Sequence, residues 1–237
     1  MLQLSSVNIC IYCKNRIIEE NICHIIPESL GNKDYVFNPP QECKNCNHNL
    51  AYLESALLDF PSVKLARTLG GIFNKEGKVP ESSFQNIRAI KDADTMHIYT
   101  SGKEIKKIKN TKEITFTMNF SAQKLKQVLR GLYKIGLGHI SQQLGSELAL
   151  SPRFDGVRDI ISGTLDFDGY LILKAERKPT NVLRIDAREF TNNKTGGSYY
   201  MFYINIFGTL MVYDIERRIL DYPDKMPDGT IYYLTNP

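Results

Sequence analysis

The chain has 237 residues, of which 42% are hydrophobic and 24% are charged, and its net charge is +4 at pH 7. This composition is typical of a globular protein large enough to bury its own core. No apolar run approaches the roughly 18 residues of a membrane-spanning helix, so we expect no membrane partner. Five cysteines without a recognisable secretory signal favour metal binding in a reducing cytoplasm over disulfides.

The densest pattern lies in residues 10–49. Two C-x-x-C pairs, Cys10/Cys13 and Cys43/Cys46, stand on either side of a His-Ile-Ile-Pro run. Four thiols in two such pairs can close a tetrahedral zinc site, although unrelated buried thiols would show the same letters. The 29-residue spacer, 14 to 42, is longer than that of a simple four-cysteine ribbon, so we expect it to hold structure of its own.

This stretch resembles the HNH endonuclease family, and closely the subgroup whose nuclease motif is stapled by a four-cysteine zinc site. The family pattern runs C-x-x-C, acid-His-Ile-Ile-Pro, Leu-Gly-Gly, Asn and C-x-x-C-Asn. The chain reads CIYC, CHIIPESLGN, Asn38 and CKNCN, in the same order, and the resemblance covers about residues 8–60. It implies a zinc-stapled ββα-metal module, with a hairpin over residues 16–27 whose first strand is Ile17-Ile18 and whose second strand contains His24.

The leucine spacing predicts a helix from about 47 to 60, a break at Pro61 and a further helix over 62–73. A long apolar periodicity predicts one helix over 121–150. Its glycines each cost about 1 kcal/mol against alanine unless another element packs closely against them. A shorter helical piece is expected at 155–161.

Runs of β-branched and aromatic residues predict strands, listed by range: 87–90, 96–100, 113–118, 170–176, 182–190, 198–206 and 209–215. The predicted fold class is therefore α+β. We expect a nuclease module at 1–80, followed by a domain at 81–237 in which a helix packs on an antiparallel sheet.

The resemblance also implies roles for three residues. His24 matches the general base that activates water for phosphodiester hydrolysis, as an imidazole near its pKa can do. Asn38 matches the middle residue that braces this geometry through the backbone, and Asn47 matches a ligand of the catalytic cation. Asn47 could instead cap its helix, because Asn is a favoured N-cap residue.

The chain departs from the family at Cys23, where an acidic residue or histidine normally binds the catalytic metal. A thiolate suits Zn²⁺ or another late transition metal and binds Mg²⁺ poorly. Three alternatives stay open: a thiophilic catalytic metal, a hard site completed by His48 or Glu28, or a weakened site in which Cys23 is an ordinary buried thiol. The catalytic cation could thus be Mg²⁺, Mn²⁺, Ni²⁺ or Zn²⁺, beside a structural Zn²⁺.

Other charged groups have weaker signals. Lys103, Lys106, Lys107 and Lys109 could track a phosphate backbone, or they could belong to a solvated loop. Lys134 could serve the same purpose or lie on a solvated helix face. His48 and Glu54 follow the second cysteine pair on the predicted helix, and Glu54 could pair with a nearby Lys or Arg. His97 and His139 are assigned structural roles.

These observations favour a metal-dependent HNH endonuclease that hydrolyses DNA, in a bacterial or phage defence or restriction context. The alternative is a non-catalytic, zinc-stabilised nucleic-acid-binding protein with a degenerate HNH site. A third possibility is that the substrate is RNA. A protein partner, or a second copy bound through the domain at 81–237, is the remaining expected partner class.

Overall fold

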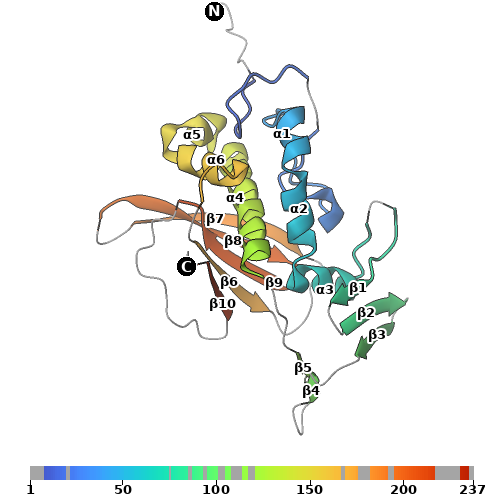
Figure 1. Ribbon diagram of the computed structural model, residues 1–237. Coiled ribbons are helices and arrows are strands. Elements are labelled where there is room, and N and C mark those ends of the chain that lie inside the picture. Colours follow the sequence, from blue (N-terminus) through green and yellow to red (C-terminus); the bar gives the residue numbers. More distant parts are fainter. Residues whose placement is uncertain are drawn as a thin grey trace, which may run out of the picture.

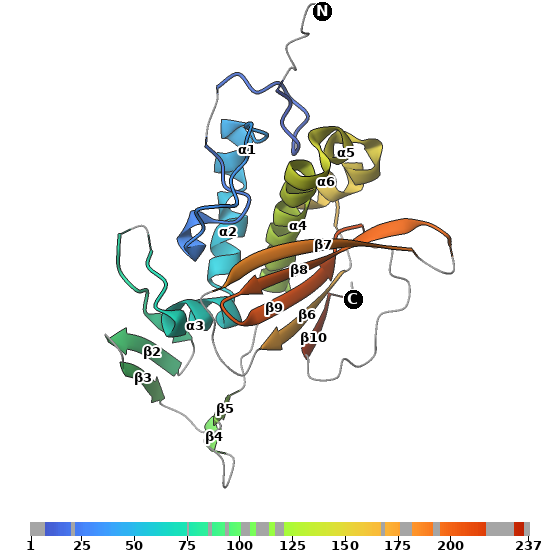
Figure 2. The ribbon, with the colours of Figure 1, turned by 180° about the vertical axis from the view of Figure 1, so that it is seen from behind.

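The structure, a computed structural model, describes residues 8–19, 22–74, 76–84, 87–92, 95–100, 105–107, 114–116, 121–166, 169–175, 182–191, 195–216 and 230–234. It confirms an α+β architecture in which a long helix lies against an antiparallel sheet and the N-terminal segment lies beside the helices (Figures 1 and 2). No helix in this described part of the chain is long and apolar enough to cross a membrane.

The N-terminal segment contains a short hairpin-like pairing, held by one isolated β-bridge, that differs from the predicted hairpin. Residues 23–25 pair with 35–37 through the His24–Val36 bridge, and not with Ile17-Ile18. Residues 16 and 17 are already used, because Arg16 bridges Ile9 and the Ile17 N–H donates to Asn8. The intervening loop contains the 3₁₀ helix η1 (Glu28–Leu30).

Three helices follow the hairpin: α1 (Lys44–Asn49), α2 (Ala51–Leu58) and α3 (Pro61–Gly70). The single helix predicted over 47–60 is thus two helices that meet at Leu50. Pro61 begins α3, as expected of a residue with no N–H to donate. Gly71 caps the end of α3 in the left-handed conformation, with φ of 66°, so the helix ends at Gly70, three residues before the predicted end.

The long helix α4 (Ala122–Leu144) begins at Ser121, whose hydroxyl accepts the Lys124 N–H. It stops earlier than the apolar periodicity predicts, because Gly145 has φ of 103°, a conformation that breaks the helix. The chain continues as α5 (Ser146–Leu150), η2 (Pro152–Phe154) and α6 (Asp155–Ser162).

Three glycines inside α4 are sites of close packing, which offsets the cost of glycine in a helix. A Cβ at Gly131 would lie 2.9 Å from the Leu53 carbonyl oxygen of α2. A Cβ at Gly136 would meet side chains of the sheet, and one at Gly138 would meet side chains of the hairpin. The glycines therefore let α4 approach both the N-terminal segment and the sheet.

All described strand pairs are antiparallel. The strands are β1 (Ser82–Phe84), β2 (Ile87–Asp92), β3 (Thr95–Thr100), β4 (Ile105–Lys107), β5 (Ile114–Phe116), β6 (Gly169–Ala175), β7 (Leu183–Thr191), β8 (Ser198–Ile206), β9 (Thr209–Asp214) and β10 (Thr230–Leu234). They form sheets β1-β2-β3, β4-β5 and β10-β6-β9-β8-β7. The predicted strands are found, while β1, β4 and β10 were not predicted.

One hydrophobic cluster runs through the molecule. It joins residues of the hairpin, such as Ile25, to Leu53 of α2, Tyr133 of α4 and Phe202 of β8. Residues on both sides of position 80 therefore share a core.

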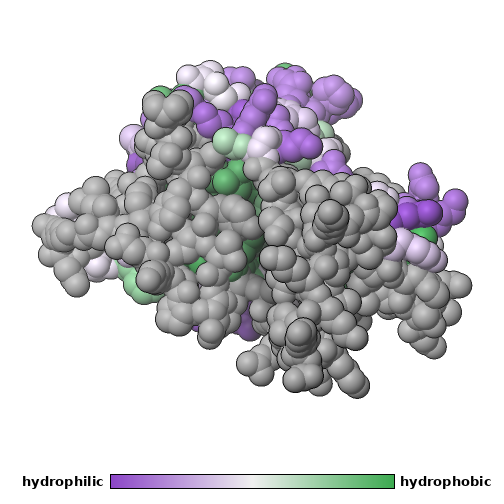
Figure 3. Space-filling model, turned by 60° about the horizontal axis from the view of Figure 1, so that its bottom comes forward, coloured by the Kyte–Doolittle hydropathy of each residue, from purple (hydrophilic) through white to green (hydrophobic). Residues whose placement is uncertain are grey.

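In the face shown in Figure 3, apolar surface is visible at the centre and hydrophilic side chains gather along the upper rim.

Candidate metal centre and functional site

The first cysteine pair lies on a tight turn closed by main-chain hydrogen bonds. The Cys10 N–H donates to the Asn15 oxygen at 2.8 Å, and the Lys14 N–H donates to the Cys10 oxygen at 2.8 Å. Lys14 adopts a left-handed conformation, with φ of 59°, which lets the chain turn back after Cys13. We call residues 9–16 the first knuckle.

The second cysteine pair lies at the start of α1. Cys43 is its N-cap, and its sulfur accepts the Cys46 N–H at 3.4 Å, while the Asn47 N–H donates to the Cys43 oxygen at 3.0 Å. Because Cys43 takes the capping position, Asn47 lies inside the helix. The alternative in which Asn47 caps the helix is therefore wrong.

The four sulfurs of Cys10, Cys13, Cys43 and Cys46 lie within 4.8 Å of one another, and Cys13 and Cys43 are 3.7 Å apart. A zinc ion with bonds of about 2.3 Å to each sulfur places tetrahedral ligands about 3.8 Å apart. The described geometry therefore fits a metal ion such as zinc.

The pKa values of these thiols reflect their proximity and burial. A hydrogen bond from Cys46 lowers the pKa of Cys10 to about 5, whereas burial raises the pKa of Cys13 to about 11. Without a cation, one thiolate suppresses ionisation of its neighbours. A bound cation binds all four as thiolates, so loading the site releases protons.

His24 lies on the first strand of the hairpin. The Ile25 N–H donates to the Tyr35 oxygen at 2.9 Å, and the Phe37 N–H donates to the Cys23 oxygen at 3.0 Å. Side chains alternate along a strand, so Cys23 and Ile25 are buried while the His24 ring is half-buried on the opposite face. The ring forms no hydrogen bond with any residue that the structure describes.

The hairpin loop is anchored by a residue that sequence reasoning missed. Asn32 is 3% exposed, and its carboxamide nitrogen donates to the oxygens of Ile26 at 2.6 Å and Tyr35 at 3.0 Å. Its oxygen accepts the N–H groups of Asp34 at 3.0 Å and Tyr35 at 2.8 Å. The available signal was the Leu-Gly-Asn run, in which Asn32 replaces the second glycine of the family pattern.

Cys23 points into the interior. Its side chain is 1% exposed, and the thiol lies 3.6 Å from the Glu42 main-chain oxygen. Burial, and then the charge of Glu42, raise the pKa of Cys23 to about 12, so the thiol is neutral at pH 7. Among the described residues, Cys23 belongs to no cluster of three or more potential metal-binding side chains.

An open hollow of about 950 Å³ lies between the first knuckle and the helices α1 and α2. Its lining includes Arg16, Ile18, Lys44, Asn47, His48 and Glu54. Asn47 therefore faces a space that could receive a ligand. His24 and Asn38 are not among the lining residues, so this hollow brings together only one of the three predicted catalytic positions.

A buried ionic cluster underlies the hollow. Lys134 of α4 is 2% exposed, contrary to the expectation of a solvated helix face, and its ammonium lies 2.8 Å from Glu54 Oε1 and 3.2 Å from Glu42 Oε1. Burial alone would lower the pKa of Lys134, but the two carboxylates raise it. Burial raises the pKa of Glu42 to about 7. The expected ion pair of Glu54 is confirmed, and it fastens α2 to α4.

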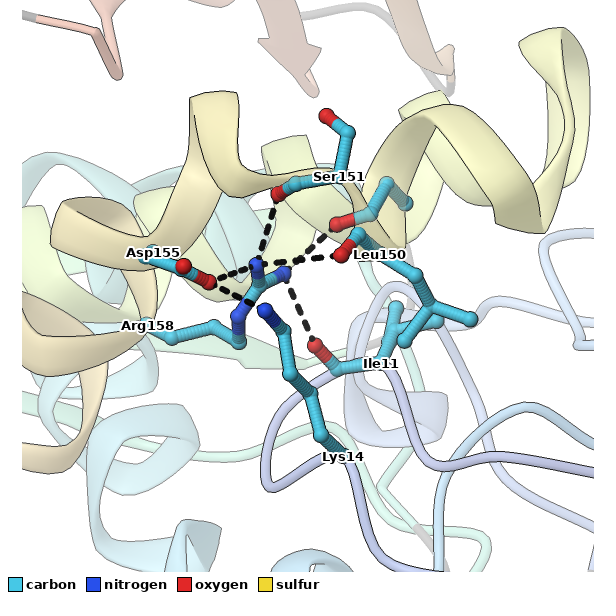
Figure 4. Close-up of polar contacts among 7 residues, drawn as sticks. Ile11, Lys14, Leu150, Ser151, Asp155 and Arg158 are labelled. Carbon is cyan, nitrogen blue, oxygen red and sulfur yellow. Dashed lines mark hydrogen bonds and ion pairs between the residues drawn. The ribbon is translucent and has the colours of Figure 1, made fainter.

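A second cluster fastens the first knuckle to α5 and α6 (Figure 4). The Arg158 guanidinium donates to the main-chain oxygens of Ile11 at 3.4 Å and Ser151 at 2.9 Å. It also donates to the oxygen of Ala149 and pairs with Asp155, which in turn binds the Lys14 ammonium. Both terminal nitrogens of this buried arginine have partners, most of them main-chain carbonyls, so we interpret the contact as structural.

The predicted lysine patch is described only in part. Lys106 and Lys107 lie on β4, whereas Lys103 and Lys109 fall outside the described residues. His139 is buried on α4 against Phe202, in keeping with a structural role.

No protein-family model matches the chain, and no match was found among curated proteins or solved structures.

Proposed function

We propose that the chain is a metal-dependent HNH endonuclease that hydrolyses DNA phosphodiester bonds. The observation that supports this best is the order of elements beside the four cysteines. The hairpin with His24 on its first strand is followed directly by α1, which contains Asn47. The resemblance likewise implies a hairpin and a helix held by four cysteines, although it places the hairpin over residues 16–27 and the structure pairs 23–25 with 35–37.

The chemistry follows from the side chains. His24 would take a proton from water, and its half-buried ring on a paired strand has a restricted orientation. Asn47 would offer its side-chain oxygen to a divalent cation, which when bound supplies charge stabilisation for the reacting phosphate. Cys10, Cys13, Cys43 and Cys46 would hold a separate structural zinc ion.

The test is plasmid cleavage by the full chain in Mg²⁺, Mn²⁺, Ni²⁺ or Zn²⁺. His24→Ala should abolish cleavage, and Asn47→Ala should reduce it strongly. Asn49 is an exposed asparagine on the same helix, so Asn49→Ala is the matched control and should cleave normally. Zinc content and melting temperature should be equal in all variants. Wild-type-like cleavage by His24→Ala would remove the general-base assignment.

A second candidate is a nucleic-acid-binding protein without catalysis. It is favoured by Cys23, which stands where the family has a metal-binding acid and is buried against Glu42. Gel-shift binding with no nicking in any of the four metals would support this candidate over the first. Parallel assays on structured RNA decide whether RNA replaces DNA as the substrate.

A further inference from the structure

One face of α4 follows the N-terminal segment. Lys134, Gly138, Ser141 and Gln142 are spaced at i, i+4, i+7 and i+8, which places them on one side of a helix. Lys134 binds the carboxylates below the hollow. A Cβ at Gly138 would lie 3.1 Å from the Phe37 ring, so the helix touches the hairpin there. Ser141 donates to the Gln41 side chain just before the second cysteine pair.

At the end of this face, the Gln142 side chain forms hydrogen bonds with both the N–H and the carbonyl oxygen of Asn38. The Asn38 N–H donates to Gln142 Oε1 at 3.1 Å, and Gln142 Nε2 donates to the Asn38 oxygen at 3.2 Å. A carboxamide carries one acceptor and an N–H donor in the same plane, so it can satisfy both groups of one residue as a neighbouring strand would. Gln142 thus extends the hairpin with a side chain from another part of the chain.

The clamp acts on the strand that faces His24. Asn38 directly follows Phe37, whose N–H donates to the Cys23 oxygen at 3.0 Å, and Val36 forms the bridge with His24. The other end of the same short strand is held by Asn32 through Tyr35. Two side-chain amides therefore bracket residues 35–38. The one at the Asn38 end comes from α4.

We propose that Gln142 is a positioning residue for the nuclease site, which it serves by fixing Asn38 and the strand paired with His24. This inference rests on the proposed function, and it assigns the helical part of the chain a role in the reaction. Gln142 is half-buried, its two bonds lie at the surface, and it is not a member of the hydrophobic core. Loss of the clamp should loosen the strand and leave the fold intact.

Two variants remove the clamp in different ways. Gln142→Ala deletes both bonds. Gln142→Glu keeps the size of the side chain but replaces its donor with a carboxylate oxygen that repels the Asn38 carbonyl. Gln143→Ala is the matched control, because Gln143 is the adjacent, exposed glutamine. If the hydrogen bonds and not the packing matter, the alanine and glutamate variants of Gln142 should behave alike.

The readouts are plasmid-cleavage kinetics, zinc content and amide hydrogen exchange over residues 35–38. We expect both Gln142 variants to lower kcat about ten- to hundredfold, since a displaced catalytic group costs up to about a hundredfold. KM should change less than about twofold, zinc content should be unchanged, and exchange at Asn38 should accelerate. Gln143→Ala should match the wild type in every readout.

The outcomes separate this inference from the proposed function. If the wild type cleaves DNA and Gln142→Ala cleaves equally fast, the positioning role is overturned and the nuclease assignment stands. Equal losses in Gln142→Ala and Gln143→Ala would also overturn it, because the effect would then be a general one on α4. If the wild type cleaves nothing in any metal, the nuclease assignment fails first and the positioning role fails with it.

Discussion

The contact between α2 and α4 at Gly131 permits a sharp test of how the two halves of the chain pack. Gly131 is buried inside α4, and a Cβ added there would lie 2.9 Å from the carbonyl oxygen of Leu53 and 3.5 Å from its carbonyl carbon. The obstacle is main chain, which cannot rotate away as the end of a side chain can. Gly131→Ala should therefore push the two helices apart.

The expected magnitude combines two opposing effects. Overpacking a well-filled site costs about 1–3 kcal/mol, and the backbone contact favours the upper half of that range. Alanine regains about 1 kcal/mol of helix propensity over glycine. The net loss is about 1–2 kcal/mol. At about 2–4 °C per kcal/mol for a chain of this size, Tm should fall by about 2–8 °C.

Thermal unfolding followed by circular dichroism measures this change, and Gly156→Ala is its matched control. Gly156 lies in α6, where an added Cβ would have nothing within 4 Å, so only the propensity gain applies. Its Tm should rise by up to about 4 °C. If Gly131→Ala raised Tm as Gly156→Ala does, the close approach of α2 and α4 would be refuted.

Two further predictions concern the metal and the pH dependence of stability. A chelator, or Cys46→Ser, should remove the bound metal and lower Tm by more than about 10 °C, since structural zinc contributes on the order of 10 kcal/mol; Cys23→Ser, outside the cluster, should keep full metal content by mass spectrometry. Burial lowers the pKa of His139 below its ordinary value of 6.5, so the unfolded chain binds the proton more readily. Stability to urea should therefore fall as pH drops below about 6.5, and His139→Gln should flatten that dependence. A slope unchanged in His139→Gln would contradict this.

Local sequence patterns predicted much of the fold. Two C-x-x-C pairs predicted the cysteine cluster because their spacing places the sulfurs around a common point. Pro61 marked the start of α3, and β-branched runs marked the larger strands. The sequence left open whether another element packs against the glycines of the long helix; the structure shows such packing at three of them, while Gly145 ends the helix because its φ is 103°.

Long-range pairing escaped the same reasoning. The family resemblance placed the hairpin partner of residues 23–25 at 17–18. The structure uses 35–37 instead, since Asn32 closes the longer loop by satisfying several main-chain groups at once. A single buried asparagine leaves no periodic signal, so the spacing rules gave it no weight.

The sequence by itself determined that four cysteines form one cluster, that His24 precedes a helix containing Asn47, and that helices combine with antiparallel strands. Each of these depends on residues close in sequence or on a regular period. Only the tertiary structure decided that Lys134 is buried between two carboxylates and that Gln142 holds Asn38. These contacts join residues about a hundred positions apart, and their partners are selected by the packing of α4, which no local pattern encodes.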